Sequence, residues 1–442
     1  MADTVDQAKL VLNSFAAIFQ NNLLSKELVT WEKFDNEMSD RNALTVVQQV
    51  GPRYVTTQTV DGVADLTAGV QDTVMGSEQY KLNRTFNSNM GFSDFQRIRD
   101  IGEARKSTAL QNAAINMAEQ IDKYILGYVQ NASNNFTGTP GNAVATFQDV
   151  ITGYTRLKEE GVPDADLRAV LTYGDKQALG QDVIGKVGSL QEAGATAYRS
   201  GWSGMVGGID TLFTQQLSPL SFGTRTNGTV NGAAQNVNYK AVSVSGAPGQ
   251  FLSQTFNIAG LGAAATIADG EIFTIANVFA YDNRAQKSLA PRLQQFRVIG
   301  ATVADGAGNA TVRMFPALIV PNTTTAIGDN AVNTANATVS AAPANSAAVT
   351  WLGTASTTVT PRVIVDKGAV IVNTADLIMP ATGTATRMSL SKVPVSVRMW
   401  WDSTFATADH RVRFDIALAA NIVDRRRLVR SEMSGRLGIA AK

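Results

Sequence analysis

The chain has 442 residues, 44% of them hydrophobic and 17% charged, a composition typical of a globular protein of two or three domains. It has no Cys, which excludes disulfides, cysteine–zinc sites, iron–sulfur clusters and thiol catalysis. It has a single His, His410. Its net charge of +1 gives the whole chain no strong attraction for nucleic acid or for an acidic membrane.

The first 50 residues are predicted to form an arm. Residues 4–20 fit an amphipathic helix, because apolar residues recur there at helical spacing. These residues are Val5, Ala8, Leu12, Phe15 and Phe19. Residues 21–50 offer Trp31 and Phe34 as large apolar anchors, but nothing in them suggests an independent core. We therefore expect residues 1–50 to pack on something else.

Residues 51–93 are predicted to form an extended, two-stranded excursion. The stretch opens with Gly51-Pro52 and is rich in Thr, Val and Gly. Apolar and polar residues alternate around Tyr80, from Gln79 to Asn83, which indicates a strand. The excursion is expected to return near Gly91.

Residues 94–131 hold the strongest helical pattern in the chain. Ser93 or Asp94 can cap this helix, and Gly102 can kink it. Its apolar face is formed by Leu110, Ala114, Met117, Ile121, Tyr124 and Tyr128. A helix of about 35 residues spans about 50 Å, which is longer than a small core requires.

Residues 132–223 and 361–442 alternate between helical and strand patterns, which predicts a compact α/β region. The first part is predicted to hold a helix over 144–157, a strand over 167–173 and a short helix from Asp175. The second part is predicted to hold short strands at 362–365 and 369–372 and long paired strands at 395–401 and 411–419.

The block from Thr224 to Thr360 has 12 charged residues among 137 and is rich in Ala, Asn, Thr and Gly. Strand patterns separated by turn signals predict an inserted β module, either a small barrel or a sandwich. The charged stretch from Asp282 to Arg292 is predicted to be a loop. Residues 322–350 have low complexity and are predicted to form another loop or a loosely held excursion.

No catalytic, cofactor or metal site is predicted. His410 lies between two expected strands and reads as a turn residue, and Glu159-Glu160 as a solvated helix end. The glycines between Gly201 and Gly208 lack the Lys-Ser/Thr of a phosphate loop. The acidic N-terminus lacks the features of a secretory signal, and no run of about 18 apolar residues suggests a membrane span.

The C-terminal region carries a cluster of arginines that could contact nucleic acid phosphates or a neighbouring subunit. The cluster consists of Arg425, Arg426, Arg427 and Arg430. The alternative is a solvated terminus or an ion-pairing strand end. No aromatic residues alternate with these arginines, so base stacking is not supported.

Several local runs, in this order, carry a resemblance to the coat proteins of P22-like tailed bacteriophages. Met90-Gly91 through Phe95-Gln-Arg-Ile98 resembles the segment where the extended loop of that family returns into a long helix. Ala197-Tyr-Arg-Ser-Gly201, Gly208-Ile-Asp210 and Leu217-Ser-Pro219 resemble the run before its inserted domain. Asp269-Gly270-Glu271-Ile272 and the residues up to Val278 resemble a run inside that domain.

The resemblance implies an α+β, HK97-like capsid fold with an inserted all-β domain. Its parts would be an N-terminal arm at 1–50, an extended E-loop at 51–93 and a spine helix at 94–131. The P- and A-domains would come from 132–223 and 361–442, and the inserted β-barrel from 224–360. Subunits would form hexamers and pentamers of an icosahedral shell around double-stranded DNA. A scaffolding protein and a portal protein would be partners, a decoration protein a further one, and the host cytoplasm the place of assembly.

The sequence departs from this family at the loop expected to contact a neighbouring capsomer. Residues 242–255 carry no charge, so an ion-pair contact through that loop is doubtful. The substitute contact candidates are Asp282, Arg284, Lys287 and Arg292, together with Trp31, Phe34 and Tyr80. The alternatives are another phage structural protein, such as a decoration or tail component, an encapsulin-like shell, or an enzyme with an α/β core. Deleting residues 1–20 is predicted to disturb assembly more than folding.

Overall fold

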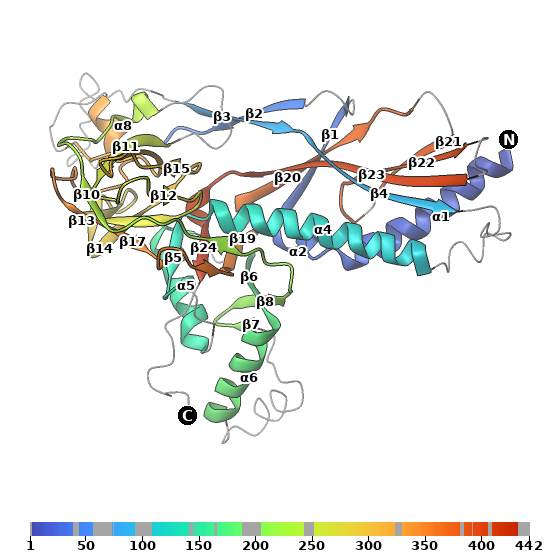
Figure 1. Cartoon of the computed structure of the whole chain (residues 1–442), viewed down its shortest axis with the longest axis horizontal. Coiled ribbons are helices and arrows are strands. Elements are labelled where there is room, and N and C mark those ends of the chain that lie inside the picture. Colours follow the sequence, from blue (N-terminus) through green and yellow to red (C-terminus); the bar gives the residue numbers. More distant parts are fainter. Residues whose placement is uncertain are drawn as a thin grey trace, which may run out of the picture. The chain divides into compact units, whose positions relative to one another are not determined.

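The computed structural model describes residues 2–38, 44–55, 73, 75–92, 108–140, 144, 146–162, 166–187, 205–242, 252–322, 329–380, 384–390, 392–404 and 409–431. The chain divides into two compact units, each built from segments that are distant in the sequence (Figure 1). Unit 1 comprises Met1–Val46, Tyr80–Val129 and Asp366–Asp424, and unit 2 comprises Val47–Gln79, Gln130–Val365 and Arg425–Lys442. Within the described ranges, no helix is long and apolar enough to cross a membrane.

Unit 1 is organised around a six-stranded sheet whose central strand is β23 (Asp409–Ile422). The other strands are β1 (Thr30–Met38), β4 (Arg84–Phe92), β20 (Val370–Leu377), β21 (Thr384–Ser389) and β22 (Ser396–Thr404). The strands β22 and β20 pair with consecutive halves of β23, and β4 pairs with residues that overlap both halves. A strand has two edges, so β4 occupies one edge of β23, and β22 and β20 share the other. The predicted pairing of the long strands near 395–401 and 411–419 is confirmed.

The two faces of this sheet carry different side chains, because neighbouring residues of a strand point to opposite faces. On one face, the ring of Phe414 stacks on Phe15 of α1 (Ala2–Asn22), with centroids 4.0 Å apart and an interplanar angle of 3°. On the other face, Ala417 and Ala419 pack against Tyr80 and Leu82. The two faces of β23 therefore make separate contacts, one with α1 and the other with β3.

A pair of strands is present, β2 (Leu44–Val50) and β3 (Gly76–Leu82), but only β3 lies within the predicted excursion 51–93. The paired strand begins at Leu44, inside the stretch that the sequence assigns to the arm. Residues 56–72 lie outside the described residues.

The predicted long helix is α4, described over Thr108–Ala132, and the expected start at Ser93 or Asp94 lies outside the described residues. The apolar face predicted for it is confirmed at Leu110, Ala114, Met117 and Ile121, which are buried, whereas Tyr124 and Tyr128 are half-buried. Asp122, also buried, accepts hydrogen bonds from the backbone N–H groups of Leu24 (2.8 Å) and Ser25 (2.9 Å). These donors open the short helix α2 (Ser25–Leu28), so a side chain of the long helix caps a helix of the arm.

Asp122 gives unit 1 a pH-dependent contact. Burial raises the pKa of its carboxyl to about 6, although the N–H groups of Leu24 and Ser25 favour the charged form. An unfolded Asp titrates near 3.9, so between these two values the folded state binds the proton more tightly. The contribution of Asp122 to stability is therefore largest below about pH 4 and falls as the pH rises through 6. From pH 7 to pH 5 we expect a gain of about 1 kcal/mol, measured by urea unfolding and absent from Asp122→Asn. Equal pH dependence in both proteins would contradict this assignment.

Unit 2 contains a second six-stranded sheet, in the order β5-β24-β19-β6-β8-β7. Its strands are β5 (Asn135–Thr137), β24 (Leu428–Ser431), β19 (Arg362–Asp366), β6 (Leu167–Leu171), β8 (Ile209–Phe213) and β7 (Met205–Val206). The helices α5 (Phe147–Glu159) and α6 (Tyr173–Val187) belong to the same unit. The predicted helix, strand and helix between residues 144 and 187 are confirmed. Their apolar side chains, including Leu157, Leu171 and Leu179, form one core with Ile364 and Val429.

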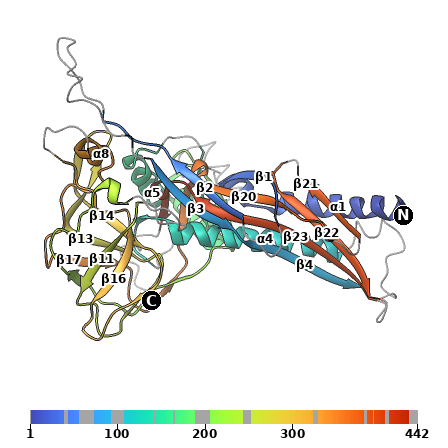
Figure 2. The ribbon, with the colours of Figure 1, turned by 90° about the horizontal axis from the view of Figure 1, so that it is seen from above.

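The low-charge block forms a closed barrel, which confirms the inserted all-β domain and decides between barrel and sandwich (Figure 2). Its strands, in order around the barrel, are β10 (Gly228–Val230), β11 (Gln254–Ala259), β16 (Ala310–Phe315), β14 (Lys287–Val298), β13 (Ile272–Asp282) and β17 (Ala348–Leu352). In β11, Phe256 and Ile258 are buried while Thr255 and Asn257 are exposed. This alternation explains the composition, because small polar residues cover an apolar interior.

Two stretches of the barrel predicted to be loops contain regular secondary structure. The charged stretch from Asp282 to Arg292 is the tip of the β13–β14 hairpin, in which Asp282 pairs with Lys287. The low-complexity stretch 322–350 holds the helix α8 (Asp329–Ala335) and the start of β17. Its side chains Val332 and Val339 are buried. The loop prediction holds for the turn at 283–286 but was wrong for the strand residues on either side, which are paired in the hairpin. In 322–350 it was wrong for α8 and β17, because burial of a few apolar residues decided the structure rather than the average composition.

The point where the chain enters the barrel is held by a buried ion pair. Glu271 is 0% exposed, and its carboxylate accepts the guanidinium of Arg225 at 2.5 Å. The same carboxylate accepts the backbone N–H groups of Gly223 (2.5 Å) and Ala268 (2.9 Å). A Cβ on Gly223 would lie 2.0 Å from the carbonyl oxygen of Thr266, so only Gly fits there. One carboxylate thus connects the segment that enters the barrel, at Gly223 and Arg225, to Ala268.

Minor elements complete the described chain. Short strands pair as β9 (Leu220–Ser221) with β18 (Thr358–Val359) and β12 (Thr266–Ile267) with β15 (Thr302–Val303). Single turns of 3-10 helix are η2 (Tyr239–Val242), η3 (Lys367–Ala369) and η4 (Arg425–Arg427).

Candidate assembly surfaces

The residues considered for chemistry lie in ordinary secondary structure where the structure describes them. Within the described ranges, no three His, Asp or Glu side chains come together as metal ligands would. His410 lies in β23 opposite Ser403, and so it is a strand residue rather than the predicted turn residue. Gly207 and Gly208 form the turn between β7 and β8 with positive φ angles of 56° and 85°, as expected for a tight turn.

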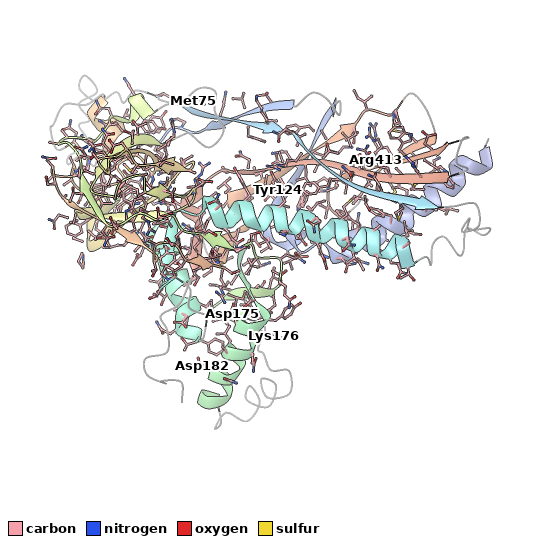
Figure 3. All side chains as sticks on the ribbon, in the orientation of Figure 1. Met75, Tyr124, Asp175, Lys176, Asp182 and Arg413 are labelled. Carbon is pink, nitrogen blue, oxygen red and sulfur yellow. The ribbon has the colours of Figure 1, made fainter. Side chains whose placement is uncertain are left out.

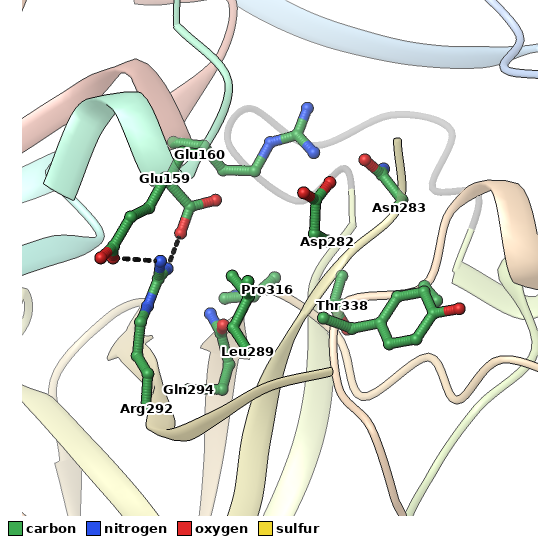
Figure 4. A pocket seen from close by; sticks show the side chains of 12 residues that line it. Glu159, Glu160, Asp282, Asn283, Leu289, Arg292, Gln294, Pro316 and Thr338 are labelled. Carbon is green, nitrogen blue, oxygen red and sulfur yellow. Dashed lines mark hydrogen bonds and ion pairs between the residues drawn. The ribbon is translucent and has the colours of Figure 1, made fainter. Parts of the chain in front are cut away.

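The barrel hairpin uses its charged residues inside its own subunit. Arg292 forms an ion pair with Glu159 (Nη1–Oε2 2.6 Å) and a second one with Glu160 at the end of α5 (Figure 4). Both partners come from the region predicted to be a solvated helix end. The guanidinium of Arg284 packs against Gly161, directly after them. The charge of Arg292 is therefore compensated within the chain, and its role in reaching a neighbouring capsomer stays a prediction.

The other two members of this cluster have different roles. The carboxylate of Asp282 accepts the backbone N–H groups of Arg284 (2.9 Å) and Ala285 (3.2 Å), which stabilises the hairpin turn. Lys287 begins β14 and is exposed. Of the four candidates, Arg284 and Lys287 are the ones that are exposed at the hairpin tip.

Among the apolar contact candidates, Trp31 and Phe34 lie on β1 and are half-buried, whereas Tyr80 is buried. The Trp31 indole N–H donates to the carbonyl of Ser25 at 3.4 Å. The Tyr80 hydroxyl accepts a hydrogen bond from the side chain of Asn373. Burial raises the pKa of Tyr80 to about 12, with a smaller effect from the nearby Glu32. Tyr80 is thus a core residue of unit 1, which corrects its assignment as a surface contact.

The C-terminal arginines divide into buried and half-buried groups. Arg425 is 5% exposed, with its guanidinium 5.3 Å from the ring centroid of Phe315. Arg430 is 2% exposed and donates to the carbonyl of Gly270 at 2.6 Å. These two guanidiniums are committed within unit 2, so the expected contact with the genome is corrected for them. Arg426 and Arg427 are half-buried.

The sheet of unit 1 carries a groove that was not predicted from the sequence. It has a volume of about 490 Å³ and is lined by Asn89, Met90, Gly91, Trp400, Asp402, Arg411, Val412 and Arg413. Two rows of paired residues form its floor, Asn89–Arg413–Trp400 and Gly91–Arg411–Asp402. Figure 3 marks Arg413 on this sheet. The sequence signal that could have revealed the groove is the spacing of Arg411 and Arg413, which are two residues apart on a predicted strand.

The groove is bordered by a buried charge cluster. Asp415 is fully buried and accepts Arg398 at 2.7 Å and Arg413 at 2.5 Å. The Arg413 side chain remains 34% exposed. The side chain of Arg411 makes no hydrogen bond or ion pair within the part of the chain that the structure describes. The groove therefore presents the exposed Arg411 beside Asp402, its cross-strand neighbour on β22.

The α+β organisation with an inserted closed barrel is that expected of a phage major capsid protein. The chain belongs to the family described as P22 coat protein, gene protein 5, whose family model matches residues 2–434. It is accordingly a coat protein of a tailed bacteriophage, as the resemblance implied. No curated protein matches the chain.

Solved structures similar to the chain include three phage proteins. The capsid of Cyanophage P-SCSP1u has 11% identity and a TM-score of 0.43, covering 93% of this chain and 88% of that chain. The capsid of Ralstonia phage GP4 has 7% identity and a TM-score of 0.42, covering 94% and 90%. A protein of Mycobacterium phage Che8 has 9% identity and a TM-score of 0.39, covering 90% and 94%.

Proposed function

We propose that this coat protein assembles as hexamers and pentamers into an icosahedral shell that encloses double-stranded DNA, and that it acts without catalysis. The observation that carries the proposal is the family match over residues 2–434, which includes both units and the inserted barrel. In this proposal the parts are those that the resemblance implied: arm 1–50, E-loop 51–93, spine helix 94–131, P/A-domain 132–223 and 361–442, and barrel 224–360.

Exposed apolar side chains on the excursion support assembly. Val47 is 52%, Tyr54 54% and Met75 52% exposed, and all three lie on or beside β2 and β3. Large apolar residues gathered on one extended element favour burial by a neighbouring molecule. Together with Trp31 and Phe34, they are our contact candidates between subunits.

The remaining partners follow from the same proposal. A scaffolding protein and a portal protein would act during assembly, which would take place in the host cytoplasm, and a decoration protein could bind the finished shell. Packaged DNA would lie against the inner face, where Arg426 and Arg427 replace the buried Arg425 and Arg430 as contact candidates.

Electron microscopy and sedimentation of the protein, expressed alone and with its neighbouring genes, test this function. We expect closed shells, or hexamers and pentamers, in at least one of the two preparations. A folded monomer in both preparations would contradict the proposal and favour an accessory structural protein.

A further inference from the structure

The barrel carries an exposed Asn-Gly pair in the turn that follows β10. Asn231 and Gly232 come directly after the last residue of β10, and both are exposed. The side-chain amide of Asn231 makes no hydrogen bond within the part of the chain that the structure describes. Gly232 has a φ of 107°, a conformation that Gly adopts without strain. The amide of Asn231 and the backbone of Gly232 are therefore neighbours in an open turn.

Only an exposed hydrogen bond restrains the backbone nitrogen of Gly232. Its N–H donates to Oδ1 of Asn345 at 3.0 Å, in a contact that solvent reaches. The carbonyl groups of Asn231 (3.0 Å) and Gly232 (3.2 Å) both accept from the side-chain amide of Gln235, which keeps the turn folded. A solvent-exposed hydrogen bond is replaced by one to water at little cost. The nitrogen of Gly232 can thus become free without any opening of the barrel.

The second Asn-Gly pair of the sequence, Asn227-Gly228, lies in a closed environment. The side-chain oxygen of Asn227 accepts the backbone N–H of Trp351 at 3.1 Å. Gly228 begins β10, which pairs with β11 on one edge and with β17 on the other. A Cβ on Gly228 would lie 2.6 Å from the carbonyl oxygen of Ala259, so this backbone is tightly packed. The same dipeptide therefore occurs twice in the barrel, once open and once held.

We propose that Asn231 is a site of spontaneous deamidation, an inference that does not depend on the proposed assembly. The backbone nitrogen of Gly232 gives its proton to water and forms a bond to Cγ of Asn231. The bond from Cγ to the amide nitrogen breaks, and ammonia leaves with a proton taken back from water. A second water then opens the five-membered succinimide at one of its two carbonyls, which leaves aspartate or isoaspartate at this position. Gly favours the attack, because it has no side chain to shield its nitrogen.

The reaction places a negative charge where the surrounding chain has none. Three stretches meet at this turn, since Asn231 donates its backbone N–H to the carbonyl of Asn257 (3.0 Å) and Gly232 donates to Asn345. These stretches, 226–239, 252–268 and 330–361, contain no Asp, Glu, Lys or Arg. The new carboxylate lowers the formal net charge of the chain from +1 to zero. Because the position is exposed, the charge stays hydrated and the fold is expected to tolerate it.

Tandem mass spectrometry of the aged full-length protein compares the two pairs within one chain. The folded protein is incubated at mildly alkaline pH, and the exchange of NH2 for OH is located by fragmentation of the peptide that holds both sites. We expect Asn231 to react at least about tenfold faster than Asn227, which must first lose its hydrogen bond with Trp351 and the strand pairing of Gly228. In urea, where both restraints are lost, the two rates should agree within about twofold. Equal rates in the folded protein would overturn the proposal.

Three variants test the atoms assigned to the reaction. Asn345→Ala frees the N–H of Gly232 and should accelerate the change at Asn231 about threefold, with no effect at Asn227. Asn231→Gln adds one methylene, so that attack would have to close a six-membered ring, and it should abolish the slow appearance of a more acidic form in isoelectric focusing. Asn227→Gln is the matched control and should leave that form unchanged. An acidic form that appears equally fast in Asn231→Gln, or an unchanged rate in Asn345→Ala, would contradict the assignment.

Discussion

Glu271→Ala is expected to destabilise the inserted barrel by about 3–5 kcal/mol. The substitution leaves the guanidinium of Arg225 buried without its ion-pair partner, 2% exposed and 4.8 Å from the ring centroid of Trp351. It also removes the acceptor of the Gly223 and Ala268 N–H groups, each of which costs about 1–3 kcal/mol when it stays buried and unpaired. Burial already lowers the pKa of Arg225, and Glu271 opposes that effect. Urea unfolding together with hydrogen exchange of the barrel amides measures the loss.

Two further variants separate charge from hydrogen bonding at this site. Replacing both Glu271 and Arg225 by Leu removes the unpaired charge, and it should recover part of the stability lost in Glu271→Ala. The recovery should be incomplete, because Gly223 and Ala268 still lack an acceptor. As a control, Asp210→Ala breaks the exposed pair with Arg168 and should cost less than about 1 kcal/mol. A Glu271→Ala protein as stable as this control would contradict the role assigned to Glu271.

The sequence predicted the elements whose pattern is local. Alternation identified the strands that became β22 and β23, and helical spacing identified the buried face of α4, because both depend on residues within a few positions. The low charge of the barrel block followed from alternation between a buried apolar side and a small polar side. The same reasoning failed for residues 322–350, which were predicted to form a loop. A few apolar residues among Ala, Asn and Thr instead close the barrel through β17.

Contacts between distant residues could not be predicted in this way. Arg292 and Glu160 are separated by 132 positions, and neither neighbourhood indicates the other. Without that pair, the charges at the hairpin tip read as a surface free to meet another subunit. The groove depended on register, because Trp400, Arg413 and Asn89 share a row only once three strands are aligned. Tyr80 was misassigned for a related reason, since its burial depends on β20 and β23.

Removing residues 1–20 is expected to prevent the monomer from folding, which reverses the prediction made from the sequence. The helix α1 contributes Leu12, Phe15 and Phe19 to the core of unit 1, each at most 1% exposed. Losing side chains of this size costs about 2–5 kcal/mol each, and together this is comparable to the whole stability of a typical domain, about 5–15 kcal/mol. We expect the truncated protein to lack a cooperative unfolding transition in circular dichroism.

Single substitutions in α1 distinguish loss of packing from loss of an assembly contact. Phe15→Ala should cost about 3–5 kcal/mol, because the ring lies between Phe19 and Phe414, with centroid distances of 6.3 and 4.0 Å. Asn13→Ala alters an exposed position of the same helix and should change stability by less than about 0.5 kcal/mol. If the protein lacking residues 1–20 unfolded cooperatively with nearly unchanged stability but formed no shells, the helix would be an assembly arm rather than part of the core. The stacked rings of Phe15 and Phe414 favour the core, because an arm held only by neighbouring subunits would have no reason to bury three large apolar side chains in its own.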